Sequence, residues 1–286
     1  MADLEVVERR STNDPATRHP VSRSAWLLWN FRQSTLPYRI VILVLLGALW
    51  QAAALYKNNA LMFPTLTATV AALWRGVTDE GLLMAALQSL AVLSKGYAVG
   101  MGLAIVLASL AALSRFMHEL LSTLAAMFMP LPAIALLPLT MLWCGIGEKS
   151  LILVLVHSVV WPVATAVLTS FAGVPPTLRL VGRNYGFSGP RFVALILIPA
   201  ALPGIITGLK IGWAFAWRTL IASELVFGIS SSKGGLGWYI FMNRNELLTD
   251  NVFAGLAVVI IIGLLVEFGV FRLVEQHTIR RWGMQS

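Results

Sequence analysis

Apolar stretches of about twenty residues recur along this chain, and they constrain its fold more than any other feature. A helix of about twenty residues is long enough to cross a hydrocarbon core of roughly 30 Å. Of the 286 residues, 58% are hydrophobic and only 12% are charged, unlike the usage of soluble domains. We therefore predict an all-α polytopic membrane protein with six spans, at residues 40–56, 90–113, 120–143, 151–171, 202–227 and 252–273.

The distribution of Lys and Arg residues predicts the side of the membrane that each end occupies. An even number of spans places both termini on one side, and 13 of the 21 Lys and Arg residues fall on that side. Five fall in the opposite loops and three fall within spans. Since cytoplasmic loops carry the excess of positive charge, we expect both termini to be cytoplasmic. The net charge of +8 is then a topology signal, and we expect no nucleic-acid partner.

The chain divides into three predicted parts. Residues 1–39 are polar, carry mixed charge and lack the early apolar core of a secretory signal. We expect them to form a cytoplasmic tail that is partly disordered. Residues 40–273 form the predicted six-helix transmembrane domain, with a cytoplasmic loop at 172–201, and residues 274–286 form a cytoplasmic C-terminal tail.

The loop at residues 172–201 contains the signals of a short helix. Pro175 and Pro176 suit its first turn, where a missing backbone N–H costs nothing, and Gly186 suits a left-handed cap at its end. The helix predicted between them, at 177–185, is too short to be stable alone in water and needs tertiary contacts. We interpret it as a docking element. The alternative is a generic polar connection between two spans.

The spacing within this loop resembles the coupling loop of binding-protein-dependent importer permeases. Gly186 is followed, after nine residues, by Ile-Leu-Ile-Pro at 196–199, as in that family. The family's glycine is preceded by a Glu-Ala-Ala triplet, and the aligned residues here are Leu180, Val181 and Gly182. This chain therefore lacks the acidic residue of the triplet but keeps the short helix.

Several further blocks resemble the nitrate, sulfonate and taurine branch of the same family. They occur in the family's order and spacing, and together they cover roughly residues 60 to 275. The blocks are Pro-Leu-Pro at 130–132, Leu-Pro at 137–138, Trp-Cys-Gly-Ile-Gly-Glu-Lys-Ser at 143–150, Pro-Ala-Ala-Leu-Pro-Gly at 199–204 and Ala-Ser-Glu-Leu at 222–225.

The resemblance implies a type I ABC importer permease fold and a transport subunit that is not itself an enzyme. It implies a homodimer of permeases in the lipid of the bacterial inner membrane, two cytoplasmic ATPase subunits, and a periplasmic or lipid-anchored substrate-binding protein. ATP and Mg would bind the ATPase, with no cofactor or metal on this chain. The solute would be small, such as nitrate, a sulfonate, taurine, bicarbonate or another organic acid, moved by alternating access. The ATPase-coupling residues it implies are Thr177, Leu180, Val181, Gly182, Arg183, Tyr185 and Gly186.

Charged and aromatic residues in the fifth span predict part of a translocation wall. Lys210, Trp217 and Glu224 are successive heptad steps on one helical stripe, with Trp213 beside them. Because intramembrane charges usually face protein or water, this stripe is a candidate lining of a water-containing passage. The alternative is that Lys210 and Glu224 extend to opposite membrane boundaries.

Arg218 lies near the middle of the same span, where its side chain cannot easily reach either boundary. Two interpretations remain open. Arg218 is either a fixed cation for an anionic substrate or the partner of a carboxylate or carbonyl on a neighbouring helix.

The face of the fifth span nearly opposite the charged stripe carries Gly204, Gly208 and Gly212 at four-residue steps. Small residues at this spacing let two membrane helices approach closely, so we predict helix packing there. Pro130, Pro132 and Pro138 should kink the third span. The irregular backbone could line a cavity, and kinked packing alone would explain the prolines equally well.

Two rival functions have weaker support. An intramembrane hydrolase needs a nucleophile beside a base, whereas the neighbouring His157 and Ser158 point about 100° apart on a helix. An ion-gradient-driven secondary transporter fits six helices with intramembrane charges. The loop at 172–201 favours the importer, and strict dependence on ATP would distinguish the two.

Overall fold

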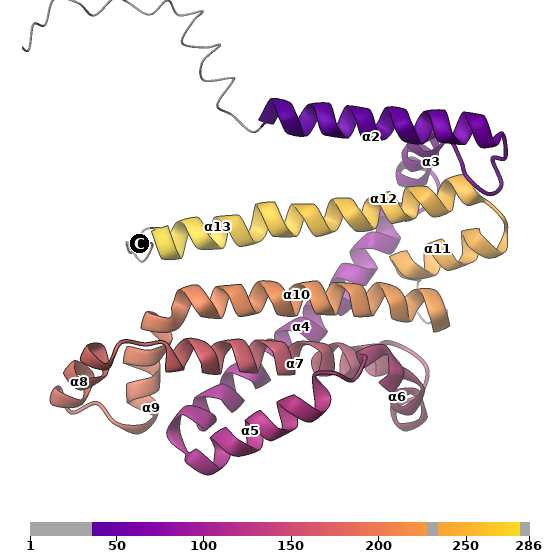
Figure 1. Ribbon diagram of the computed structural model, residues 1–286. Helices are drawn as coiled ribbons and strands as arrows, with labels where there is room; N and C mark the ends of the chain where they lie inside the picture. The colour runs from indigo at the N-terminus through magenta and orange to yellow at the C-terminus, as the bar shows by residue number, and fades with distance from the viewer. Residues whose placement is uncertain (1–35, 228–233, 281–286) are drawn as a thin grey trace, which may run out of the picture. The chain divides into compact units, whose positions relative to one another are not determined.

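The computed structural model describes residues 36–227 and 234–280, and every regular element within these ranges is a helix (Figure 1). The predictions for residues 1–35, 228–233 and 281–286 lie outside the described residues. The chain separates into two compact units, Met1–Ala53 and Ala54–Ser286, which we describe one at a time.

Helix α2 (Leu36–Lys57) begins in the first unit and ends in the second. Its apolar side chains from Ile40 to Leu46 are exposed. A helix that is apolar on all sides suits a lipid environment. It corresponds to the span predicted at 40–56.

The second unit contains the other helices. Together with α2, five helical segments are long and apolar enough to cross a membrane, and a bent pair makes six if it counts as one span. The structure therefore confirms an all-helical, multi-pass fold over the described ranges, while the number six and the side of the termini stay predictions. The main elements are α3 (Leu66–Thr78), α4 (Leu82–Leu113), α5 (Arg115–Phe128), α6 (Leu137–Cys144), α7 (Glu148–Ala172), α8 (Pro176–Asn184), α9 (Gly189–Phe192), α10 (Ile198–Phe227), α11 (Leu236–Asn245), α12 (Thr249–Leu265) and α13 (Arg272–Glu275).

Helix α7 forms the centre of the second unit, because the two most extensive helix–helix contacts in the structure are those of α7 with α4 and with α10. Small residues make the α4 contact close. A Cβ at Gly96 would lie 2.6 Å from Cβ of Leu155, and one at Gly100 would lie 2.8 Å from Cβ of Val159. Packing of this kind holds membrane helices together without a hydrophobic driving force between them.

The third predicted span is broken rather than kinked. Helix α5 is followed by the 3-10 turn η2 (Ala133–Leu136) and by α6, and the two parts meet at 89°. Pro130 and Pro132 have no backbone N–H to donate, so the helix stops at the break, and Pro138 lies in the first turn of α6. The segment predicted as one kinked helix over 120–143 is two helices with irregular backbone between them, and their assignment to one span stays a prediction.

A polar network joins α3, α11 and α12. This network was not predicted from the sequence, because neither α3 nor α11 was predicted as a helix. Arg75 pairs with Asp250 at 3.0 Å. The Tyr239 hydroxyl donates a hydrogen bond to the Glu80 carboxylate at 3.1 Å. The side-chain amide of Asn251 donates to the same carboxylate at 2.9 Å. Burial, reinforced by this hydrogen bond to Glu80, raises the pKa of Tyr239. The phenol therefore stays protonated as the donor.

Candidate functional site

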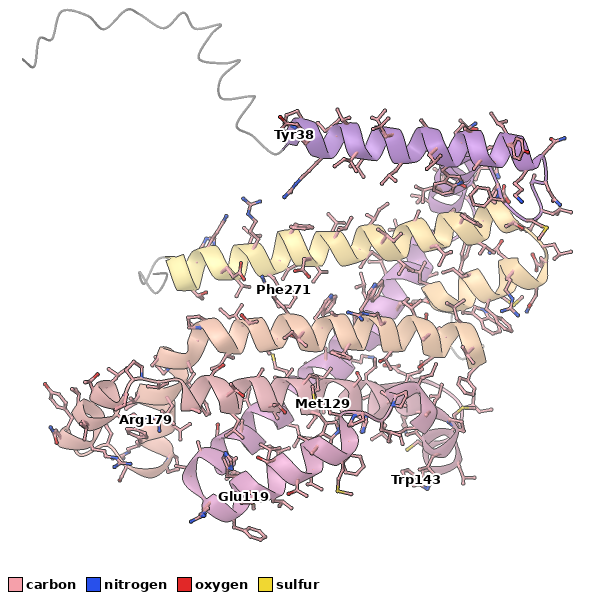
Figure 2. The ribbon with its side chains drawn as sticks, viewed as in Figure 1. Tyr38, Glu119, Met129, Trp143, Arg179 and Phe271 are labelled. Atoms are coloured by element: carbon pink, nitrogen blue, oxygen red, sulfur yellow. The ribbon has the colours of Figure 1, made fainter. Side chains whose placement is uncertain are left out.

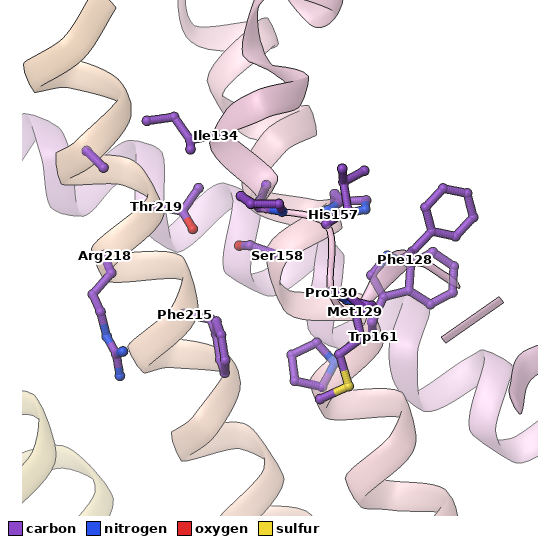
Figure 3. A pocket seen from close by; sticks show the side chains of 15 residues that line it. Phe128, Met129, Pro130, Ile134, His157, Ser158, Trp161, Phe215, Arg218 and Thr219 are labelled. Carbon is purple, nitrogen blue, oxygen red and sulfur yellow. The ribbon is translucent and has the colours of Figure 1, made fainter. Parts of the chain in front are cut away.

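A cavity of about 380 Å³ opens beside the broken third span. Its walls come from the irregular segment after α5, from α7 and from α10 (Figure 3). The lining residues are Phe128, Met129, Pro130, Leu131, Pro132, Ala133, Ile134, His157, Ser158, Trp161, Pro162, Phe215, Arg218, Thr219 and Ala222.

Helix α10 contributes residues at positions i, i+3, i+4 and i+7 to the cavity, namely Phe215, Arg218, Thr219 and Ala222. The guanidinium carbon of Arg218 lies 5.7 Å from the centre of the Phe215 ring. No carboxylate of the described residues lies within ion-pair distance of Arg218. A lone cation near the bilayer centre costs about 3 kcal/mol or more, so Arg218 requires water or an anion.

Helix α7 contributes an aromatic wall with unused polar atoms. His157 and Trp161 are one helical turn apart, and Phe128 stacks on Trp161 with ring centres 5.1 Å apart. Both ring nitrogens of His157 and Nε1 of Trp161 are buried and have no hydrogen-bond partner in the described part of the chain. Each such group costs about 1–3 kcal/mol if nothing satisfies it. The cavity is therefore suited to a ligand or water that hydrogen-bonds here.

The lining contains one charged residue, and that residue is a cation. This cation is Arg218, and the lining also contains the N–H donor Trp161, but none of its residues is acidic. The Ser158 hydroxyl donates to the Leu155 carbonyl of its own helix at 2.7 Å, so it is not poised as a nucleophile against His157. Pro130 and Pro132 line the cavity, which is one of the two roles that the sequence left open for the prolines, whereas Pro138 does not line it.

Of the five residues predicted to line a pathway, Arg218 is the one that lines this cavity. Lys210 instead forms an ion pair with Glu275 and lies 6.0 Å from the centre of the Phe271 ring. The heptad stripe could not reveal this pair, because Glu275 is distant in sequence.

The two tryptophans of the stripe, Trp213 and Trp217, pack within the protein and do not line the cavity. Trp213 meets Tyr97 of α4 edge to face, with ring centres 5.5 Å apart. Trp217 is 6% exposed. Their contribution to a passage stays a prediction.

Glu224 is fully enclosed at 1% exposure and connects three helices. Its carboxylate accepts hydrogen bonds from the Ser89 hydroxyl of α4 at 2.9 Å and from the backbone N–H of Gly237 in α11 at 2.7 Å. The Leu236 N–H donates in turn to the Ser89 oxygen at 2.7 Å. The structure thus gives Glu224 a positioning contact at the junction of α4, α10 and α11. A pathway role for it stays a prediction.

The three glycines predicted for helix packing lie against α7. Added Cβ atoms at Gly204 and Gly212 would collide with the side chains of Ser170 and Val163. A Cβ at Gly208 would lie 2.6 Å from Cβ of Ala166. The absence of side chains at these positions sets the distance between α7 and α10.

The short helix of the 172–201 loop is α8 (Pro176–Asn184), one residue earlier than predicted at each end. Pro176 occupies its first turn, and Gly186 has φ +79°, a left-handed conformation that favours glycine. Gly182 is buried, and a Cβ there would lie 2.8 Å from Cγ1 of Ile196. Gly182 aligns with the last residue of the family's Glu-Ala-Ala triplet. A bulkier residue at 182 would push α8 away from the segment that leads into α10.

Apart from Gly182 and Arg179, most of α8 and the residue after it are exposed. Leu180, Val181 and Tyr185 are exposed, and so are Thr177 and Arg183 (Figure 2 shows this end of the molecule near Arg179). Residues 172–201 contain arginines but neither Asp nor Glu. Exposed apolar residues on so short a helix are typical of a contact surface.

Arg179 connects α8 to α7. The sequence showed only that this loop contains several arginines, and it did not predict this contact. Its guanidinium donates to the carbonyls of Val174 at 3.2 Å and of Phe171 at the C-terminal end of α7. A cation there satisfies carbonyls that lack helical partners and complements the helix dipole. Arg179 therefore positions α8, whereas the side chain of Arg183 is exposed.

Long apolar helices around a cavity, together with an exposed short helix between two spans, define a multi-pass membrane transport protein. The model of the family described as binding-protein-dependent transport system inner membrane component matches residues 100–280, more than half of the chain. The chain belongs to this family of ABC importer permeases, as its coupling-loop motif implied. It is a multi-pass protein of the bacterial inner membrane.

Several curated permeases are similar to the chain. A putative ABC transporter permease protein of Methanocaldococcus jannaschii is 28% identical over 85% of this chain and 91% of its own length. The taurine transport system permease protein of Escherichia coli is 35% identical over 58% of this chain and 59% of its own length. The nitrate import permease protein of Synechocystis is 30% identical over 67% of this chain and 68% of its own length.

Proposed function

We propose that this chain forms the translocation pathway of an ATP-driven importer for a small anion. Membership of the binding-protein-dependent permease family carries the proposal. Relatives named for nitrate, taurine, aliphatic sulfonates and bicarbonate suggest an anionic solute. The cavity with Arg218 and without acidic residues is consistent with such a solute.

In this proposal the energy comes from two partner ATPases, which bind ATP and Mg and dock on α8. The exposed apolar face of α8 is the surface on which they act, and Gly182 and Arg179 hold that helix to the permease. Closure of the ATPases on ATP moves α8, and the permease reopens toward the other side of the membrane. The permease itself carries out no hydrolysis.

The remaining partners follow from the same proposal. Two copies of the permease enclose the pathway, each with both termini in the cytoplasm, and an external substrate-binding protein delivers the solute. The six-span arrangement counts α5 and α6 as the two halves of one broken span.

The docking role of α8 is tested by the double variant Leu180→Ala, Val181→Ala. Both side chains are exposed, so the variant should fold and dimerise normally while substrate-stimulated ATP hydrolysis by the assembled complex falls about tenfold or more. Leu43→Ala, which removes an equally exposed leucine from α2, is the matched control and should retain full coupling. Normal stimulation of the double variant would refute the assignment of α8.

A further inference from the structure

We propose that a second cavity, at the end of the second unit that carries α8, binds the phosphate group of an anionic phospholipid. Its volume is about 620 Å³, within the range of about 300–1,000 Å³ that is typical of small-molecule sites. It lies between the α4–α5 corner, the C-terminal end of α7, α8 and α9, which gather at one end of the second unit (Figure 1). The inference goes beyond the proposed function, because this cavity shares no lining residue with the cavity that contains Arg218.

Charge is the first argument. Arg179 and Arg183 line the second cavity, and none of its lining residues is acidic. The carboxylate of Glu119 lies 3.8 Å from Nδ1 of the lining residue His118, but Glu119 is not part of the lining. Arg183 has no ion-pair partner within residues 36–227 and 234–280. Positive charge in a pocket at the cytoplasmic ends of spanning helices attracts anionic lipid headgroups.

The two arginines are placed to share one phosphate. They are four residues apart on α8, so their Cβ atoms are neighbours on one face of the helix. Arg179 donates through Nε to the carbonyl of Val174 and through Nη2 to that of Phe171. These bonds hold its guanidinium at the cavity and leave Nη1 for a ligand. Arg183 is exposed and can donate to the same phosphate in charge-assisted hydrogen bonds.

The apolar part of the lining favours a phosphate ester carried by a lipid over a free one. Leu113 is the last residue of α4, and Leu168 and Phe171 belong to the last turns of α7. Both helices are long and apolar enough to cross a membrane. The cavity thus combines the apolar ends of two spanning helices with the arginines of the loop between spans. A phospholipid matches both parts, whereas a free phosphate ester would leave the apolar surface wetted.

The site leaves the proposed ATPase surface of α8 available. At about 100° per residue, Arg179 and Arg183 lie on one side of this helix, and Thr177 and Val181 lie nearly opposite. A lipid under α8 and a partner on its outer side can therefore be bound together. The rival occupant is an acidic side chain of the partner, which would displace the lipid on assembly.

The test is native mass spectrometry of the full-length permease, released from micelles that contain equal amounts of phosphatidylglycerol and phosphatidylcholine. Each arginine near an anionic headgroup contributes about a fivefold change in binding, so we expect phosphatidylglycerol to be retained at least fivefold more strongly. Glycerol 3-phosphate carries the same kind of phosphate ester without acyl chains. At equal concentration it should bind at least tenfold more weakly than phosphatidylglycerol.

Variants locate the site. Arg183→Gln changes an exposed side chain and should lower retention of phosphatidylglycerol about fivefold, and Arg183→Lys should recover part of the loss. Arg191→Gln is the matched control, because it removes an exposed arginine of the same loop that does not line the cavity. It should retain phosphatidylglycerol as the wild type does. Arg179→Gln should also weaken binding, and if it unfolds the permease by releasing the end of α7, Arg183→Gln decides alone.

Equal retention of the two lipids by the folded wild type would overturn the inference, and so would equal retention of phosphatidylglycerol by Arg183→Gln and Arg191→Gln. Glycerol 3-phosphate bound as tightly as phosphatidylglycerol, and lost in Arg183→Gln, would identify a soluble phosphate ester and refute the lipid. Release of the lipid when the partner ATPase is added would identify an acidic side chain of that partner as the occupant and would also count against the inference. Lipid retention is measured on the permease without ATP, so its outcome is independent of the importer assignment.

Discussion

Glu224, a buried carboxylate, makes contacts that the sequence did not predict. As part of a heptad stripe it is a candidate for lining a passage. In the structure it accepts hydrogen bonds from Ser89 and from the N–H of Gly237, and so connects α4, α10 and α11. Gly237 is required there, because a Cβ would lie 2.5 Å from Cβ of Glu224. The sequence signal that could have indicated this contact is the pair of glycines at 235 and 237.

Glu224→Ala should destabilise the purified permease by about 1–3 kcal/mol, because it leaves the Gly237 N–H and the Ser89 hydroxyl buried without their acceptor. Glu224→Gln keeps one acceptor oxygen and nearly the same shape, so its loss should be smaller. Thermal unfolding followed by tryptophan fluorescence measures both. Equal stability of Glu224→Ala and the wild type would contradict the positioning role.

Arg218 illustrates what the sequence can and cannot predict about the site. Its position near the middle of an apolar span was enough to single it out. His157 and Trp161 could not be assigned to the lining of the same cavity, because that lining depends on how α7 is rotated against α10 and on where the third span breaks. Rotation and crossing angle come from tertiary packing.

At the scale of elements, close packing of α7 against α10 depends on glycine. Gly208→Ala should destabilise the permease by about 1–3 kcal/mol, because the new methyl group would meet Ala166 of α7. Gly102→Ala in α4 is the matched control, since nothing lies within 4 Å of the added Cβ. That control should be neutral or slightly stabilising, because alanine favours the helix over glycine. Unfolding temperatures in detergent compare the two, and equal effects would refute the packing argument.

The boundaries of the elements were predictable where local chemistry sets them. Helix α8 was placed to within one residue, because Pro176 fixes its first turn and Gly186 the left-handed residue beyond its end. The break of the third span was only partly predictable. Pro130 and Pro132 remove helical hydrogen bonds, but the angle of 89° depends on what α6 packs against. Short helices such as α3 and α11 lack the long apolar stretch that identifies a span.

At the scale of the whole molecule, the proposed function assigns the chain a pathway component and a contact helix. The cavity containing Arg218 and the exposed face of α8 lie on different parts of the second unit, and α7 and α10 run between them (Figure 1). Arg179 attaches α8 to the end of α7, and the packed glycines attach α7 to α10. This continuous set of contacts would allow movement of α8 to reach the cavity as rigid-body motion of helices.

Uptake by the purified permease, reconstituted with its ATPase and binding protein in proteoliposomes, tests the central claim most directly. Accumulation of labelled butanesulfonate or nitrate should require ATP and all three proteins, and an ion gradient without ATP should produce none. Transport by the permease alone, driven by an ion gradient, would contradict the account and indicate a secondary transporter.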